Sequence, residues 1–408
     1  MFDYIIIGGG ISGLYCAYSL LKKTTNLLIV EKSHRLGGRI ETRYFDGYHL
    51  EMGAGRISSS HRNIINLIEE LDMEKDLIQF PNVKSYVNIT PQNGNYQIEK
   101  IVNLQETDFY KILNSLIDRL KDPHFHILAQ NYTLFGLIER VYGVDKAVEM
   151  VNQFGYHGDF VSQNAVDGLR MFEGSFSGQN YFYGLKGGMS SIIKRLEQLL
   201  EKKIRLKTCC LDIIKNNDHF VCKMSTGDIV CRKIVLAVPK INLLKFNILN
   251  KQKLNTVKSK PLMRIYAIFS KINGKVWFDF LNGVNTTKTI VGQLIPVNKE
   301  KGILMIYCDS DNAELLYSFK KQKILKKELF VLLKKIFGSI VTKPIKITSK
   351  YWGQATHLWK PGTDSNEVGN SLINPSPNIY IIGETYSPIQ GWSEGGISTV
   401  NKFLAKHT

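Results

Sequence analysis

The 408-residue chain has no run of about eighteen apolar residues free of charge, so no membrane-spanning helix is expected. Its six cysteines form no Cys-x-x-Cys motif and no cysteine–histidine spacing typical of zinc sites. We therefore predict free thiols in a reducing, intracellular and cytoplasmic setting, with no metal site. Acidic residues are also scarce, with 36 Asp plus Glu against 53 Lys plus Arg.

The resulting net charge of +17 would suit an anionic partner such as nucleic acid, a membrane surface or an acidic substrate. The lysines are nevertheless spread along the whole chain, and only residues 320–335 concentrate them. Apolar residues recur there at helical spacing, which predicts a surface helix with a solvated basic face. Nucleic acid is therefore not expected as a partner, and the charge does not decide function.

The first residues form a nucleotide-binding pattern. Residues 3–7 end in a β-branched run that predicts a buried parallel strand. Gly8-Gly9-Gly10-Ile11-Ser12-Gly13 then leads into a helix, the setting in which GxGxxG holds a pyrophosphate at a helix N-terminus. Glu31 ends the next strand, where a carboxylate can accept the ribose hydroxyls. A signal peptide is not expected, because its cleavage would remove the first strand.

Three more motifs follow in order. Arg35-Leu36-Gly37-Gly38-Arg39 comes soon after Glu31, and Glu51-Met52-Gly53-Ala54-Gly55-Arg56 follows it. Near the end of the chain, Gly383-Glu384 precedes Gly391-Trp392-Ser393-Glu394-Gly395-Gly396. With these motifs the chain resembles the flavin-dependent amine oxidase superfamily, which includes monoamine, polyamine and L-amino acid oxidases.

The resemblance implies one bound FAD. The residues implied to hold it are Gly8, Gly10, Ile11, Ser12, Gly13, Glu31, Lys32, Arg35, Gly38, Arg39, Gly53, Ala54, Gly55, Arg56, Cys210, Gly383, Glu384, Trp392, Gly396 and Ile397. Cys210 fits equally well as a buried strand thiol. Residues 351–362 and 383–396 contain no cysteine, so a thioether to the flavin is not expected and the FAD should be non-covalent. A second GxGxxG is missing, which indicates that the substrate itself reduces the flavin.

The substrate side rests on fewer residues. The resemblance makes Trp392 one wall of an aromatic pair beside the flavin, and a packed indole is the alternative. The opposite wall would be Thr356, His357 or Trp359. Arg56 matches the arginine that clamps a substrate carboxylate in L-amino acid oxidases. The equally supported alternative is an arginine that pairs with Glu51 or Glu394 or faces the flavin.

One position departs from the family pattern. Many relatives carry a lysine that holds a water against flavin N5. The resemblance places Arg264 at this position, or Ile265 if the match shifts by one residue. Arginine cannot deprotonate at ordinary pH, so this change puts efficient use of oxygen in doubt.

Together these observations predict an α/β protein with a Rossmann-type FAD-binding domain interleaved with an α+β substrate domain. The FAD domain is expected from residues 1–79, 185–258 and 351–408, and the substrate-binding domain from residues 80–184 and 259–350. Within the substrate-binding domain, the side-chain pattern predicts strands over residues 85–89, 96–102 and 289–296. The implied reaction is oxidation of an amine or amino acid, with O2 or another acceptor reoxidising the flavin. A flavin desaturase or protoporphyrinogen-type oxidase and a non-catalytic flavin-bound protein are the alternatives.

Overall fold

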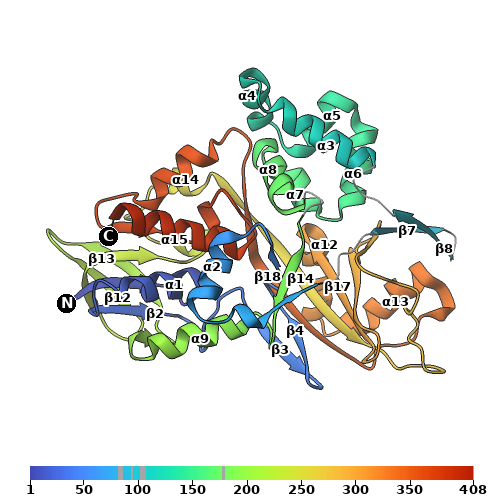
Figure 1. The fold of residues 1–408 in the computed structure, drawn as a ribbon, viewed down its shortest axis with the longest axis horizontal. Coiled ribbons are helices and arrows are strands. Elements are labelled where there is room, and N and C mark those ends of the chain that lie inside the picture. The colour runs from blue at the N-terminus through green and yellow to red at the C-terminus, as the bar shows by residue number, and fades with distance from the viewer. Residues whose placement is uncertain (81–85, 93–94, 102–106, 177–179, 408) are drawn as a thin grey trace. The chain divides into compact units, whose positions relative to one another are not determined.

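The computed structural model describes residues 1–80, 86–92, 95–101, 107–176 and 180–407 (Figure 1). The chain forms two compact units, each assembled from separate segments. Unit 1 comprises Met1–Phe80, Asn180–Ser259 and Thr356–Thr408, and unit 2 comprises Pro81–Gln179 and Lys260–Ala355. The two strands that cross between the units are β14 (Val257–Ile268) and β18 (Lys346–Trp359) among the described elements.

A largely parallel sheet forms the centre of unit 1. Its strands follow the order β10-β2-β1-β13-β12-β11, and β19 also pairs with β13. The bounds are β1 (Phe2–Ile7), β2 (Leu27–Val30), β10 (Ile204–Arg205), β11 (Cys210–Lys215), β12 (Phe220–Met224), β13 (Ile229–Leu236) and β19 (Ile379–Ile381). Tyr4 and Ile6 of β1 pack on one face of the sheet, whereas Ile5 and Ile7 pack on the other. This alternation explains why the run 4–7 is apolar throughout, because both faces of the sheet are covered.

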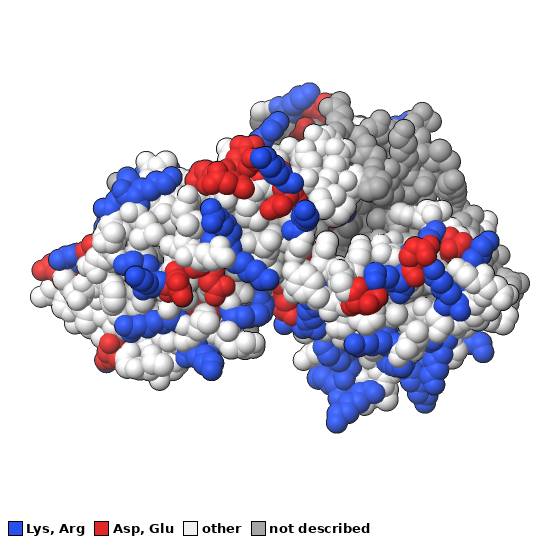
Figure 2. All heavy atoms as spheres, turned by 60° about the horizontal axis from the view of Figure 1, so that its bottom comes forward, with Lys and Arg blue, Asp and Glu red and all other residues white. Residues whose placement is uncertain are grey.

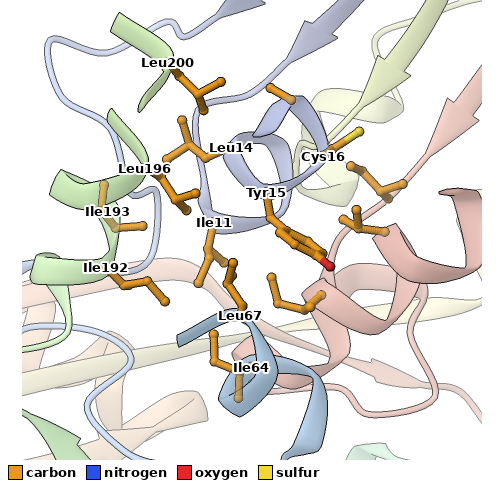
Figure 3. Close-up of a cluster of buried hydrophobic side chains, with 14 of the residues drawn as sticks. Ile11, Leu14, Tyr15, Cys16, Ile64, Leu67, Ile192, Ile193, Leu196 and Leu200 are labelled. Atoms are coloured by element: carbon orange, nitrogen blue, oxygen red, sulfur yellow. The ribbon is translucent and has the colours of Figure 1, made fainter. Parts of the chain in front are cut away.

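Four helices share the core on the Tyr4 and Ile6 face. They are α1 (Ile11–Leu20), α2 (Arg62–Glu70), α9 (Ser190–Leu200) and α15 (Ser393–His407). Figure 3 shows Ile11 and Leu14 of α1 pointing toward Leu196 and Ile192 of α9, with Leu67 of α2 close by. The last helix of the chain therefore packs in the same core as the first.

The rest of unit 1 consists of short elements around this core. They are β3 (Thr42–Phe45), β4 (Tyr48–Glu51), β5 (Ile57–Ser58), β6 (Leu77–Gln79), β9 (Phe182–Leu185), α10 (Lys240–Leu243), α11 (Lys251–Leu254) and α14 (Ser365–Ile373). Strand β9 pairs with both β5 and β6, which places Phe182 opposite Ser58. This pairing brings a segment of residues 180–185 beside the segment that carries Arg56.

Unit 2 contains a mostly antiparallel sheet and two groups of helices. The strands follow the order β18-β14-β17-β16-β15-β7-β8. The remaining bounds are β7 (Tyr86–Gln92), β8 (Asn95–Ile101), β15 (Asn285–Thr287), β16 (Gln293–Asn298), β17 (Ile303–Asp309), α3 (Asp108–Arg119), α4 (Pro123–Asn131), α5 (Leu134–Tyr142), α6 (Val144–Phe154), α7 (His157–Ser162), α8 (Ala165–Phe176), α12 (Ser310–Lys321) and α13 (Leu325–Phe337). Helices α3 to α8 enclose their own apolar core, while α12 and α13 pack on the sheet.

The predicted fold class is confirmed, and so are most of the predicted elements. The strand predicted over residues 289–296 is wrong at its start, because residues 289–292 form a turn in which the Gly292 amide donates to the Thr289 carbonyl at 3.1 Å. Strands predicted over residues 85–89 and 96–102 correspond to β7 and β8, although Ser85 and Val102 lie outside the described residues. Within the described part of the chain, no helix is long and apolar enough to cross a bilayer.

Candidate flavin and substrate site

In the glycine turn between β1 and α1, Gly13 is tightly packed whereas Gly10 borders open space. A Cβ atom on Gly13 would lie 2.0 Å from the Gly8 carbonyl oxygen, so only glycine lets α1 pack this close to β1. A Cβ on Gly10 would meet no atom within 4 Å, so the backbone there borders open space. No described side chain caps the first N–H groups of α1, which begins after Gly10. These free N–H groups and the helix dipole suit an anion such as a pyrophosphate.

Glu31 is held at the end of β2 by two backbone amides. Its Oε2 atom accepts from Gly9 at 2.8 Å, and its Oε1 atom accepts from Ser33 at 2.9 Å. The carboxylate thus stands beside the glycine turn, and each oxygen keeps a second lone pair. Lys32, also predicted to contact the cofactor, has an exposed side chain.

Arg35 shapes its own loop. The guanidinium donates to the carbonyls of Leu36, Gly38 and Ile40 and forms an ion pair with Glu41 at 3.0 Å. The contact between Arg35 and the cofactor stays a prediction.

The last helix completes the site that the first helix begins. A Cβ on Gly396 would lie 2.5 Å from the Ser12 hydroxyl, so the first turns of α15 and α1 are in contact. The Gly383 amide donates to the Thr399 hydroxyl at 2.8 Å, which ties the preceding turn to α15. Gly383 has a φ of +116°, and a Cβ there would meet nothing within 4 Å. The two ends of the chain therefore border the same open backbone region.

The Glu384 carboxylate is the centre of a buried network behind that region. Its Oε1 atom accepts from the amides of His357 and Gly391 at 2.9 and 2.8 Å. Its Oε2 atom bonds with His357 Nδ1 at 2.9 Å and with the Arg39 guanidinium at 2.5 Å. Burial alone would raise the pKa of Glu384, but Arg39 and His357 hold it well below its usual range. The carboxylate is therefore ionised, and it fixes the positions of both partners.

His357 presents an acceptor that the described chain does not use. Because Nδ1 donates to Glu384, the neutral ring carries its lone pair on Nε2. Burial lowers the pKa of His357, and the ring has no exposed surface. Nε2 has no hydrogen-bond partner among the described residues. An unmet buried acceptor costs about 1–3 kcal/mol. Because Nε2 has no exposed surface, it does not border the open backbone region, and His357 contributes through its bond with Glu384.

Arg56 lies beside two aromatic rings in unit 1. The central guanidinium carbon is 4.4 Å from the Phe182 ring centroid and 5.5 Å from that of Trp392. The two rings are nearly parallel at 10°, with centroids 6.0 Å apart. His61 meets Trp392 edge-on at 4.8 Å, and burial together with Arg56 lowers the pKa of His61 to about 4. The result is a cation next to aromatic faces and a neutral imidazole.

The carboxylates named as alternative partners of Arg56 serve other donors. Glu51 accepts from the Met189 amide at 2.8 Å and from the Thr42 hydroxyl. Glu394 accepts from the Asn63 and Ile64 amides in the first turn of α2, at 3.1 and 2.9 Å. Both interpretations of Arg56, as a clamp for a substrate carboxylate and as a structural arginine, therefore stay predictions.

The three candidates for the wall opposite Trp392 lie in different environments within unit 1. Trp359 is fully buried in the core and donates from its indole to the Ser387 carbonyl at 3.0 Å. His357 belongs to the Glu384 network. Thr356 lies against the closing turn, since a Cβ on Gly391 would be 3.6 Å from its methyl group. Cys210 begins β11 with a half-buried thiol, which leaves both of its interpretations open.

Unit 2 carries Arg264 and a buried ionic cluster that the sequence did not reveal. Arg264 pairs across the sheet with Tyr307, and its guanidinium lies 5.6 Å from that ring. Lys260 lies on the same strand, β14, four residues before Arg264. It forms ion pairs with Asp159 at 2.5 Å and Asp309 at 3.3 Å. Burial would lower the pKa of Lys260, but the two carboxylates raise it above its usual value.

Asp309 and Tyr307 also line a cavity of about 320 Å³ whose wall includes Thr286, His157 and Asn312. No spacing pattern links Asp159, Lys260 and Asp309, so sequence reasoning had no signal for the cluster. The predicted place of Arg264 beside flavin N5 stays a prediction.

The glycine turn, the Glu384 network and the order of the motifs together agree with one sequence family. The sequence model of the flavin containing amine oxidoreductases matches residues 11–399. The chain belongs to this family. Horse flavin-containing amine oxidase A is 22% identical over 97% of this chain and 83% of its own length.

Among solved structures, the fold is similar to a putrescine oxidase variant, with a TM-score of 0.79, 16% identity and 99% of each chain covered. A protein from Exiguobacterium assigned as a protoporphyrinogen oxidase has a TM-score of 0.74, at 18% identity and 99% coverage of each chain. At such identities the structural likeness concerns the fold. Membership in the amine oxidoreductase family implies an oxidoreductase with a flavin cofactor.

Proposed function

We propose that this protein oxidises the C–N bond of an amine or amino acid with a non-covalently bound FAD, and that O2 or another acceptor reoxidises the flavin. The carrying observation is the fit of unit 1 to a flavin dinucleotide in a chain of the amine oxidoreductase family. The free thiols Cys16, Cys222, Cys231 and Cys308 support a reducing, cytoplasmic location.

The residues that would hold the FAD fall into two groups. The N–H groups at the start of α1 and the open backbone at Gly10 suit the pyrophosphate. Glu31 suits the adenosine ribose. When bound, the flavin supplies the acceptor for two electrons and a hydrogen from the substrate α-carbon.

The chain's own part in the reaction is to bind and orient the substrate. The Arg56 guanidinium can pair with a carboxylate in two parallel hydrogen bonds. The half-buried rings of Phe182 and Trp392 flank it with apolar faces. His61 stays neutral near neutral pH and adds no competing positive charge. This arrangement favours an amino acid over a simple amine.

The proposal is tested by adding amines to the purified yellow protein without oxygen. The panel contains amino acids, polyamines, arylalkylamines and a porphyrinogen, and the visible flavin band is followed. Bleaching by one amine class is the expected result. Bleaching by the porphyrinogen alone would instead support oxidation of a C–C bond, which is the second candidate. This candidate is included because the Exiguobacterium protein has a similar fold.

Arg56→Met tests the substrate class. The change should slow flavin reduction by amino acids by at least about a hundred-fold, as expected for loss of a charge-assisted pair worth about 3 kcal/mol. Reduction by simple amines should change little. Arg62→Met is the matched control, since it removes an exposed arginine six positions later. Equal loss toward both substrate classes would contradict the carboxylate clamp.

Non-covalent attachment is tested by acid precipitation. The expected result is a colourless pellet and a supernatant that contains all of the FAD. Flavin that stays with the denatured chain would contradict this part of the proposal.

A further inference from the structure

Positive charge is concentrated in one segment of unit 2. Residues 320–350 contain ten lysines and a single acidic residue, Glu328, which gives a net charge of +9. That is more than half of the chain's +17 in less than a tenth of its length. The segment contains no arginine.

These residues form one continuous surface. Lys320 at the end of α12 donates to the Ser349 carbonyl of β18 at 3.2 Å, and Lys326 of α13 donates to the Ile345 carbonyl at 2.6 Å. Tyr317 of α12 also stacks on Tyr351 of β18 at 3.9 Å. We call this the lysine surface, and its exposed lysines are Lys320, Lys321, Lys323, Lys327, Lys334, Lys335, Lys343 and Lys346.

The lysine surface is carried by well-packed elements. Leu325, Leu329 and Leu333 of α13 are buried in the core of unit 2, so the opposite side of the helix is fixed toward solvent. Figure 2 shows blue side chains gathered at the lower right of the drawn face, where red ones are few. The lysine charges are therefore displayed together toward solvent on a folded surface.

Exposed aliphatic side chains lie between the lysines in the same segment. Val331 is 36% exposed, Ile340 45% and Ile345 58%. Phe330 is half-buried and Phe337 is buried, while the half-buried rings of Tyr317 and Tyr351 stack on each other. None of these four rings is fully exposed for stacking on bases. Lysine among exposed aliphatic residues is the combination that binds lipid headgroups and inserts into the bilayer interface. Recognition of nucleic acid would favour arginine and exposed aromatic residues instead.

We propose that the lysine surface docks the protein on an anionic lipid bilayer. The lysines contact acidic headgroups, while Ile340 and Ile345 enter the boundary between headgroups and acyl chains. The contact is peripheral and independent of the oxidation reaction proposed above. It weakens as salt rises, because screening shortens the reach of the lysine charges.

Co-sedimentation of the full-length protein with vesicles tests the proposal. Vesicles of phosphatidylcholine with increasing phosphatidylserine are used at about 0.15 M salt. Binding should increase steeply with phosphatidylserine and should be weak with phosphatidylcholine alone. Replacing Lys327, Lys334 and Lys335 by Gln should weaken binding on the order of a hundred-fold, as about five-fold per lysine implies.

Two further variants separate the possible causes. Replacing Lys202, Lys215 and Lys245 by Gln removes the same charge from exposed positions of unit 1 and should change binding less than about three-fold. Ile340→Ser with Ile345→Ser keeps every charge and should weaken vesicle binding on the order of ten-fold. Unchanged circular dichroism and flavin spectra establish that each variant is folded.

Three results would overturn the proposal. The first is that the protein does not bind phosphatidylserine vesicles. The second is that the two lysine variants lose vesicle affinity equally, and the third is that the isoleucine variant binds vesicles as tightly as the parent. Tight binding to duplex DNA without binding to vesicles would assign the lysine surface to nucleic acid instead.

Discussion

Gly10 and Gly13 stand three residues apart in one turn, yet a methyl group would meet different surroundings at each. At Gly13 it would collide with the Gly8 carbonyl, whereas at Gly10 it would enter open space. Gly10 has a φ of −77°, which alanine adopts without strain. A requirement for glycine at position 10 therefore has to come from a ligand.

Gly10→Ala should leave the stability of the cofactor-free protein within about 0.5 kcal/mol of the parent, as is usual for changes that touch nothing. It should weaken FAD binding by at least about ten-fold, because the methyl group occupies the approach to the pyrophosphate. FAD titration and urea unfolding give the two numbers. Gly174→Ala in α8 is the control, since a Cβ there also meets nothing within 4 Å. Unchanged FAD affinity in Gly10→Ala would contradict the assignment of the turn.

His61 predicts how stability depends on pH. Its folded pKa of about 4 lies below the ordinary 6.5, so the unfolded chain binds the proton more readily between these values. The stability that the neutral ring contributes is present above pH 6.5 and is lost as the pH falls toward 4. The full loss amounts to about 3 kcal/mol.

The measurement is the urea midpoint at several pH values for the parent and for His61→Gln. The variant should show a shallower decline between pH 6.5 and 4. Part of the slope should remain, because burial also lowers the pKa of His357. Identical slopes in the two proteins would show that His61 is not buried as described.

At the scale of elements, the Glu394 carboxylate links the last helix to α2. It accepts from Asn63 and Ile64 in the first turn of α2, and the Asn63 side chain donates to it at 2.6 Å. The negative charge also complements the positive end of the helix dipole. Helix α2 starts at Arg62, and its N-cap residue His61 makes no capping bond with its own side chain. Glu394 takes over that function from a distant part of the chain.

Glu394→Gln should lower the free energy of unfolding by about 1–2 kcal/mol, the range for loss of a cap and its charge. Thermal and urea unfolding measure the change. Glu197→Gln, at an exposed position of α9, should cost less than about 0.5 kcal/mol. A loss no larger than that of the control would contradict the capping role.

Elements with strong local signals were predicted well from the sequence. The β-branched run of β1, the glycine turn and α1 were found because strand, turn and helix each follow their own residue pattern. The strand expected over residues 289–296 failed because Thr289, Ile290 and Val291 have strand-like side chains. Gly292, with a φ of +70°, instead closes a tight turn there. A glycine within a short apolar run was the available warning.

At the scale of the whole molecule, the sequence named candidate site residues but not most of their contacts. Arg39, His357 and Glu384 were each named, yet nothing in their spacing indicates that one carboxylate joins all three. Phe182 was missed as a neighbour of Arg56, because the contact depends on the pairing of β9 with β5. Contacts of this kind arise from tertiary packing, which local patterns do not encode.

The central claim is that an amine of the proposed substrate class reduces the flavin through oxidation of its C–N bond. The most direct test is a single turnover without oxygen, in which the bleached flavin and the carbonyl product of imine hydrolysis are both quantified. The account predicts one equivalent of aldehyde or keto acid for each flavin bleached. Absence of bleaching with every amine, or bleaching without a carbonyl product, would contradict it.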